Sequence, residues 1–222
     1  MSIVWLEHIK DFPDPNLGDN EGLLAIGGEL TPEWLLKAYR MGIFPWFNAG
    51  DPIMWWSPNP RMILYPKEFK VSKSFRNILN KKKHVVTFNR NFQEVIQYCG
   101  EIKRMGQEGT WLTSEMKSAY LTLHKMGWAH SIEVWNESEL VGGLYGLAMG
   151  KLFFGESMFS KESNASKIAL YSLSQLLITK GFEFIDCQIY TSHLESLGAK
   201  EVERTEFIKL VQNQTNLEQV IL

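Results

Sequence analysis

Apolar residues recur along this chain at two spacings, and the change from one to the other predicts where helices and strands alternate. Spacing of three and four residues predicts helices at 72–80, 113–126 and 164–180, one opening at Asn91, a short one near His193 and a final helix. Short apolar or alternating runs predict strands at 85–88, 130–136, 140–149, 151–157, 182–187 and 201–204. Most of the chain beyond residue 66 is therefore assigned to regular elements.

The first part of the chain has fewer regular patterns and more glycine and proline. Its clearest helix follows Thr31, which can cap the first turn, and ends at Gly42. A strand is predicted at 61–65, stopped by a proline. We therefore expect a small loop-rich lobe at residues 1–65 and a larger domain at residues 66–222.

The predicted order in the larger domain is strand, two helices, three strands, helix, strand, helix, strand. This is the order of the GCN5-like N-acetyltransferase fold, an α+β fold in which helices flank a mixed sheet. Such a likeness concerns the fold and does not fix the function. In that fold a glycine-bearing turn before the long helix holds the pyrophosphate of acyl-CoA. Here the turn at 160–165 has no glycine and contains Glu162, so we expect the acyl donor not to be acyl-CoA.

An aromatic run interrupted by prolines lies between Tyr39 and Trp56. It holds six aromatic residues, with Pro45 and Pro52 among them. Rigid flat rings on irregular backbone are suited to holding a ligand with flat faces, such as a nucleobase. Equally, the rings can fill a small core under a loop, and the segment alone does not decide between these interpretations.

Basic residues are concentrated in one part of a chain whose net charge is −2. Between residues 67 and 84 the only acidic residue is Glu68, and the basic ones are Lys67, Lys70, Lys73, Arg76, Lys81, Lys82 and Lys83. This pattern is typical either of a solvated helix face or of a surface that attracts phosphate. We favour phosphate, because the acids that would neutralise such a face are missing from the segment.

The remaining composition indicates a cytoplasmic protein. No apolar run approaches the roughly 20 residues that span a bilayer, and the first residues lack the pattern of a secretion signal. The only two cysteines are Cys99 and Cys187, which fits a reducing compartment. We expect no membrane association and a monomeric state.

Asp186 and Gln188 end a strongly apolar predicted strand. Side-chain alternation would put both on one face, at the end of the strand where open α/β sheets usually bind ligands. Gln188 can accept a hydrogen bond from an attacking amine, and Asp186 can orient that amide or hold a cation. For an isolated pair of this kind, a purely structural role in capping and loop anchoring is the simpler interpretation.

Glu156 lies in an apolar predicted strand, where alternation places it with Phe154 and Met158. A carboxylate in such surroundings is costly unless it is paired. Because no basic residue lies within four positions, its partner is either a remote Lys or Arg or a cation of the ligand.

Two further residues are candidates for the site. Trp111 precedes a helix and can form another flat platform, while Tyr120 can point its hydroxyl into a cleft; core packing is the alternative for each.

Several classes of site are missing from the sequence. No histidine stands at metal-ligand spacing from another His or Cys, so we expect no metal site. We also expect no cofactor, and we interpret Cys187 as a small buried residue rather than a nucleophile.

Taken together, these segments resemble the leucyl/phenylalanyl-tRNA–protein transferases, over about residues 12–198. The matching stretches are long and rich in rare residues. They are Leu23 to Gly28, Gly42 to Phe47, Trp55 to Arg61, Gly109 to Trp111, His130 to Trp135, Phe154 to Ser160 and Ile185 to Gln188.

The resemblance implies a specific transfer reaction. An enzyme of this kind takes Leu or Phe, and less readily Met, from its aminoacyl-tRNA. It joins that residue to the N-terminal amine of a protein beginning with Arg or Lys, which marks the protein for degradation. No ATP or metal is implied, because the tRNA ester is already activated and the enzyme mainly has to position the amine.

The resemblance also implies roles for the candidate residues. Asp186 and Gln188 would orient the amine, and Glu156 would attract the N-terminal Arg or Lys of the acceptor. Trp46, Trp111 and Tyr120 would lie around the terminal adenosine and the aminoacyl group, and an apolar pocket would be formed by Leu144, Phe153 and Leu170. Phosphates of the tRNA would meet Arg76, Lys81, Lys82 and Lys83.

Two positions depart from what relatives of this family lead us to expect. Thr191 stands where we expect Asn in some of them, and Leu173 where we expect an aromatic ring. The second departure would reshape the pocket for the amino acid. Two rival functions stay open at this point: an acyl-CoA-dependent N-acetyltransferase and a tRNA-binding module without catalysis.

Overall fold

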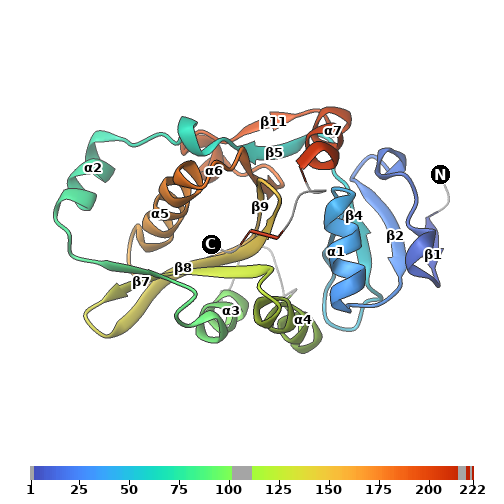
Figure 1. Ribbon diagram of the computed structural model, residues 1–222, viewed down its shortest axis with the longest axis horizontal. Coiled ribbons are helices and arrows are strands. Elements are labelled where there is room, and N and C mark those ends of the chain that lie inside the picture. Colours follow the sequence, from blue (N-terminus) through green and yellow to red (C-terminus); the bar gives the residue numbers. More distant parts are fainter. Residues whose placement is uncertain (1–2, 102–111, 215–218, 221) are drawn as a thin grey trace.

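The computed structural model describes residues 3–101, 112–214, 219–220 and 222. These residues form a four-stranded sheet near the N-terminus and a seven-stranded sheet that carries most of the helices (Figure 1). The chain is thus an α+β protein, as predicted.

The small sheet and one helix make up the N-terminal lobe. Its strands run in the order β1-β2-β4-β3 and span Val4–Leu6 (β1), Leu23–Gly27 (β2), Phe44–Pro45 (β3) and Met54–Trp56 (β4). Helix α1 (Pro32–Arg40) begins as predicted, because the Thr31 hydroxyl accepts a hydrogen bond from the Trp34 N–H group. Most rings of the aromatic run are core residues, since Tyr39, Phe44, Phe47 and Trp55 are buried.

The large sheet contains the strands that alternation predicted. Its order is β11-β5-β10-β9-β8-β7-β6, and β9 pairs with β10 in parallel while the other neighbours pair antiparallel. The bounds are Arg61–Leu64 (β5), Val85–Phe88 (β6), Ala129–Asn136 (β7), Glu139–Met149 (β8), Leu152–Ser160 (β9), Phe184–Gln188 (β10) and Lys200–Val202 (β11).

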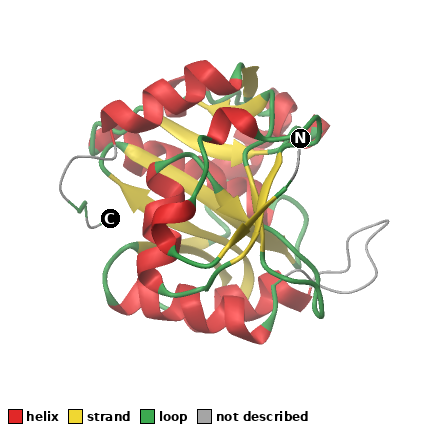
Figure 2. Cartoon of the chain, turned by 90° about the vertical axis from the view of Figure 1, so that its right-hand side faces the viewer, coloured by secondary structure: helices red, strands yellow, loops and turns green. Residues whose placement is uncertain are grey.

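Helices lie on both faces of the large sheet. They span Lys73–Asn80 (α2), Phe92–Glu101 (α3), Ser114–Lys125 (α4), Ala165–Thr179 (α5), Ser192–Ser196 (α6) and Arg204–Gln214 (α7). Helix α5 packs on one face and helices α3 and α4 on the other, so that in the turned view the strands lie between two helical layers (Figure 2). From β6 to β11 the order is the predicted one, and the large domain has the GCN5-like N-acetyltransferase fold.

Strand β5 belongs to the large sheet, although its place in the sequence suggested the N-terminal lobe. The strand predicted at 61–65 was assigned to the N-terminal lobe, but β5 pairs with β10 and β11 in the large sheet. All four of its residues are buried, as is usual for an interior strand covered on both faces. The division of the chain at residue 65 stays a proposal.

The last predicted strand was placed too far along the chain. It was expected at 201–204, whereas Arg204 is the first residue of α7. Its backbone N–H group donates to the Asn59 side chain, and its guanidinium donates to the carbonyl oxygen atoms of Ser57 and Asn16. These long-range bonds start the helix at this position.

A β-bulge in β9 changes which side chains share a face. Tyr145 lies opposite Ser157 and Gly146 lies opposite Gly155, which leaves Glu156 as the extra residue. A Cβ atom at Gly146 would lie 2.1 Å from the carbonyl oxygen of Phe154, so only glycine permits this approach of the strands.

The bulge corrects the prediction that Glu156 shares a face with both Phe154 and Met158. Glu156 and Phe154 do lie on the face covered by α3 and α4, where both contact Tyr39. Met158 packs instead with the cluster beneath α5. Simple alternation fails here because one extra residue reverses the side-chain direction.

Candidate active site

A cavity opens where strands β9 and β10 separate. The two strands pair only between Phe184–Asp186 and Leu152–Phe154, after which no further pairs form among the described residues. The cavity there has a volume of about 420 Å³. Its walls come from both strands, from α5, from the segment after β10 and from the N-terminal lobe, which contributes Phe44, Pro45 and Trp46.

The structure brings most of the predicted site residues to this one cavity. Its walls include Trp46, Leu144, Phe153, Glu156, Leu170, Asp186 and Gln188. Leu173 and Thr191, the two departures from the family pattern, line it as well. Tyr120 is fully buried and is not among the lining residues. Trp111 lies outside the described residues.

Asp186 is held by a buried ion pair that the sequence analysis missed. Arg61 donates from Nε to Asp186 Oδ1 at 2.8 Å and from Nη2 to Oδ2 at 2.7 Å, and both side chains are essentially inaccessible. The Arg61 guanidinium lies 4.6 Å from each of the ring centroids of Phe44 and Phe207. Asp186 is therefore a neutralised structural carboxylate rather than one that can hold a substrate cation.

A signal for this pair was present in the sequence. Arg61 is the one charged residue of β5, which is otherwise apolar, and Asp186 is the one charged residue of β10. Because a buried charge requires a partner, two such residues of opposite sign are candidates for each other.

Gln188 owes its orientation to an irregularity at the end of β10. The pairing with β5 shifts between Asp186 and Gln188, and Gln188 has a φ of 65°. Its backbone N–H group donates to Asp186 Oδ1 at 2.9 Å. The argument from simple alternation was therefore wrong, although both side chains do border the cavity.

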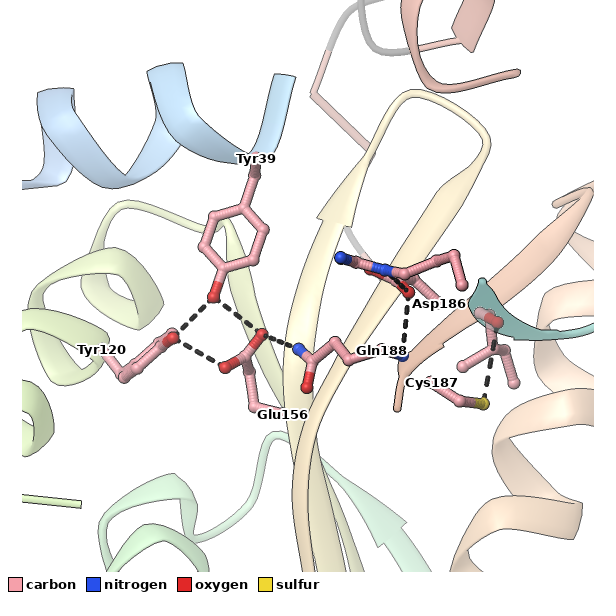
Figure 3. Close-up of polar contacts among 8 residues, drawn as sticks. Tyr39, Tyr120, Glu156, Asp186, Cys187 and Gln188 are labelled. Carbon is pink, nitrogen blue, oxygen red and sulfur yellow. Dashed lines mark hydrogen bonds and ion pairs between the residues drawn. The ribbon is translucent and has the colours of Figure 1, made fainter. Parts of the chain in front are cut away.

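The Gln188 amide is fixed at one end. Its Nε2 atom donates to Glu156 Oε1 at 3.1 Å, and Figure 3 shows the amide oxygen pointing away from that contact. Among the described residues, no donor binds this oxygen. The amide thus offers a hydrogen-bond acceptor at the cavity.

The partners of Glu156 are neutral donors. Tyr39 donates to Oε1 and Tyr120 donates to Oε2, each at 2.7 Å, and Gln188 supplies a third hydrogen bond (Figure 3). Of the two predicted alternatives, the remote basic side chain is therefore wrong, because hydroxyl groups and an amide take its place. The other alternative, a cation of the ligand, stays a prediction. The sequence analysis did not consider Tyr39, which comes from α1 in the N-terminal lobe.

Burial has the largest effect on the pKa of the Glu156 carboxyl group. It raises the pKa of Glu156 to about 7, while the hydrogen bonds from Tyr120 and Tyr39 act in the opposite direction. Burial also raises the pKa of both tyrosines well above the usual value. Glu156 therefore exchanges a proton near neutral pH, whereas the two phenols keep theirs.

The basic residues form a separate surface at α2 and the turn after it. Arg76, Lys81, Lys82 and Lys83 are exposed, as predicted for outward-facing positions. Lys83 nevertheless has an acidic partner, because its Nζ atom lies 3.0 Å from Glu162 Oε2. The prediction that no acid neutralises the cluster is wrong for this lysine, since Glu162 comes from the remote turn before α5.

The turn before α5 is occupied by the protein's own groups. Glu162 accepts hydrogen bonds from Lys83 and Asn136, and the N–H groups of Lys161 and Glu162 both donate to the carbonyl oxygen of Val141. Hydrogen bonding, chiefly from His84, lowers the pKa of Glu162 to about 2. An anionic turn with engaged amides is a poor site for a pyrophosphate.

Other kinds of site are missing from the described part of the chain. Within residues 3–101, 112–214, 219–220 and 222, no group of three or more His, Cys, Asp or Glu side chains could hold a metal ion. No helix in the same residues is long and apolar enough to cross a membrane.

The raised pKa of Glu156 predicts how stability changes with pH. The unfolded chain releases this proton at a lower pH than the folded chain, so the contribution to folding falls as pH rises from about 4.5 to about 7. Glu156→Gln removes this titration. Relative to the wild type, its unfolding free energy should rise by on the order of 2 kcal/mol between pH 5 and pH 8.

Urea unfolding at both pH values measures this difference. Glu139→Gln, at an exposed position in β8, is the matched control and should show no such change. A difference between Glu156→Gln and the wild type that is the same at pH 5 and pH 8 would contradict the assignment.

Comparison with known proteins identifies the family. The family model described as leucyl/phenylalanyl-tRNA protein transferase matches residues 63–212, and that of its N-terminal domain matches residues 28–59. A leucyl/phenylalanyl-tRNA–protein transferase from Flavobacterium johnsoniae is 55% identical over 203 residues, covering 91% of this chain and 96% of the relative. One from Syntrophus aciditrophicus is 54% identical over 211 residues, covering 95% and 88%.

Two solved structures that align with the chain are much more distant. L-PGS from Bacillus licheniformis aligns with 13% identity and a TM-score of 0.41, covering 78% of this chain and 57% of that chain. A GCN5-related N-acetyltransferase from Kribbella flavida aligns with 8% identity and a TM-score of 0.38, covering 74% and 58%. Neither bears on function at these scores. The family models and the two close relatives do bear on function. They show that the chain belongs to the leucyl/phenylalanyl-tRNA–protein transferase family of aminoacyltransferases.

Proposed function

We propose that this enzyme moves Leu or Phe, and less readily Met, from aminoacyl-tRNA to the N-terminal amine of proteins that begin with Arg or Lys. The product would be marked for degradation, and the reaction would take place in the cytoplasm. The observation that carries the proposal is an apolar cavity with the Gln188 amide oxygen at its wall.

The cavity wall suits an apolar amino-acid side chain. Leu144, Phe153 and Leu170 are almost completely buried and line the cavity together. A charged side chain in such surroundings would lose its hydration without gaining a partner, which is costly. Leu, Phe and Met would be admitted on this basis. Trp46, which is partly exposed at the cavity, offers a flat face to the terminal adenosine.

The chemistry requires positioning more than activation. The nitrogen of the acceptor amine attacks the ester carbonyl, the new amide bond forms, and the bond to the tRNA ribose oxygen breaks. The amine loses a proton and the ribose oxygen gains one. The Gln188 amide oxygen would accept a hydrogen bond from the amine and thereby direct its lone pair at the carbonyl.

Among the described residues that line the cavity, the acidic ones are Glu156 and Asp186, and Glu156 is the one left for recognising a basic acceptor. Asp186 is neutralised by Arg61, whereas the partners of Glu156 are uncharged. The approach of an N-terminal Arg or Lys side chain would favour the ionised form of Glu156, because an opposite charge lowers the pKa of a carboxyl group.

The exposed basic residues of α2 and the following turn would contact tRNA phosphates. Arg76, Lys81 and Lys82 show no acidic partner among the described residues, whereas Lys83 is paired with Glu162. Unpaired cations on one surface attract the phosphate backbone without reading its sequence.

One assay tests the proposed reaction against its two rivals. The protein is mixed with labelled Leu-tRNA and a peptide beginning with Arg, without ATP or added metal. We expect labelled peptide, and much less of it when the peptide begins with Glu. No label in the peptide would overturn the proposal, and turnover with acetyl-CoA instead would favour the N-acetyltransferase.

The salt dependence of tRNA binding tests the basic surface. Replacing both Lys81 and Lys82 with Ala should weaken binding and reduce the slope of log K against log salt by about 1.4 to 1.8, at about 0.7 to 0.9 per phosphate contact. Lys83→Ala should reduce the slope by less than one full phosphate contact, because this lysine is already paired with Glu162.

Lys10→Ala, at an exposed position in the N-terminal lobe, is the control for loss of one surface charge. Binding measured by filter retention from 50 to 300 mM salt decides the question. If the Lys81 and Lys82 variant keeps the wild-type slope, these residues do not contact phosphate.

A further inference from the structure

Three oxygen-bearing side chains beside the cavity form a closed triangle. Tyr39 Oη lies 2.7 Å from Glu156 Oε1, Tyr120 Oη lies 2.7 Å from Glu156 Oε2, and the two hydroxyl oxygens are 2.6 Å apart (Figure 3). Tyr39 comes from α1 and Tyr120 from α4, and both are fully buried. The triangle therefore connects the N-terminal lobe to the large domain.

The number of hydrogens in this triangle depends on Glu156. Each of the three contacts has the length of an O–H···O hydrogen bond, so each needs one hydrogen. The two phenols supply two. An ionised Glu156 leaves one contact without a hydrogen, whereas a protonated Glu156 supplies the third and completes a ring in which each group donates once.

Gln188 binds the same carboxylate and is affected by where that hydrogen points. Its Nε2 atom donates to Glu156 Oε1, the atom that Tyr39 also contacts. A carboxyl hydrogen directed at Gln188 would require the amide to turn its oxygen toward Glu156. The amide would then present N–H groups to the cavity, and these cannot accept a hydrogen bond from an amine.

The tyrosines offer that hydrogen another acceptor. When Tyr39 donates to Tyr120 and Tyr120 donates to Glu156 Oε2, the Tyr39 oxygen is left to accept the hydrogen from Oε1. The Gln188 amide then keeps its Nε2 atom toward Glu156, as it does when Glu156 is ionised.

We propose that Tyr39 and Tyr120 are positioning residues for aminoacyl transfer. They retain the exchangeable hydrogen of Glu156 within the triangle, so that Gln188 presents its amide oxygen to the attacking amine in both protonation states. The proposal rests on the role given to Gln188 in the proposed function.

Among the described residues, Tyr39, Tyr120 and Gln188 are the side chains that form hydrogen bonds with Glu156. Asp186 on β10 is engaged by Arg61 of β5. Tyr145 of β8 packs its ring against that of Tyr120, with 5.3 Å between centroids. The hydrogen of Glu156 therefore has Tyr39 and Gln188 as its nearby acceptors at Oε1, and Tyr120 at Oε2.

The test is the pH dependence of transfer in the double variant Tyr39→Phe/Tyr120→Phe, because in either single variant the remaining tyrosine can still accept the hydrogen of Glu156 from its own carboxylate oxygen. Single-turnover rates with Leu-tRNA and an Arg peptide are measured from pH 6 to pH 8.5 and divided by the wild-type rate at each pH, which cancels the titration of the peptide amine. We expect ratios within about threefold of one at pH 8.5 and up to about tenfold lower at pH 6, because one pH unit below a pKa leaves about a tenth of a group ionised. The decrease is smaller to the extent that the Arg side chain of the peptide favours the ionised form of Glu156.

Two further variants make the result specific. Adding Glu156→Gln to the double variant should remove the pH dependence of the ratio, since no carboxyl hydrogen remains. Tyr98→Phe, in α3 and away from the cavity lining, should keep a ratio near one at every pH.

The outcomes separate the two proposals. A ratio for the double variant that is low but constant with pH would indicate only a structural role and overturn this inference, as would a ratio of one throughout. Circular dichroism at each pH confirms that the variants are folded, and Tyr39→Leu/Tyr120→Phe replaces the double variant if that variant is not. A wild-type enzyme that forms no labelled peptide would instead overturn the proposed function.

Discussion

The buried ion pair between Arg61 and Asp186 is the interaction on which the geometry of the cavity depends. It joins β5 to β10, and the Arg61 guanidinium lies between the rings of Phe44 from the N-terminal lobe and Phe207 from α7. Burying two charges costs several kcal/mol for each ion, so the pair is favourable only with good geometry and further hydrogen bonds. Here the pair is bidentate, and Asp186 Oδ1 also accepts the backbone N–H group of Gln188. The same carboxylate that neutralises Arg61 therefore sets the position of the amide at the cavity.

The polar groups of the candidate site lie where regular strand pairing ends. Glu156 is the extra residue of a bulge in β9, and Gln188 follows a shift in the pairing of β10, with a positive φ. Beyond that point the two strands separate and the cavity begins. Bulges of this kind re-aim single side chains while the rest of the sheet stays paired. They bring a carboxylate and an amide from different strands within 3.1 Å of each other.

Most of the fold could be predicted from the sequence because its signals are local. Thr31, Ser72 and Thr113 cap their helices through bonds spanning three residues, and alternation located the strands of the large sheet. The cavity was also largely predicted, since its apolar and polar residues end or flank recognisable elements. The partners within the site were not, because Arg61 and Asp186 are 125 residues apart and Tyr39 and Glu156 are 117 apart. A bulge cannot be inferred from alternation, so the roles of Tyr39 and Arg61 required the structure.

The central claim is that Asp186 acts on transfer by holding Arg61 and the backbone of Gln188, and not by binding substrate. The most direct measurement is the single-turnover rate of Asp186→Asn together with its dissociation constant for Leu-tRNA, at a temperature where circular dichroism shows it folded. Loss of one partner of a buried pair costs about 3–5 kcal/mol in stability, so the variant should melt earlier than the wild type. Our account predicts a transfer rate at least about tenfold lower, a loss of about 1.4 kcal/mol or more of transition-state stabilisation, with tRNA affinity within about twofold of the wild type. An unchanged rate, or a loss confined to tRNA affinity, would contradict it.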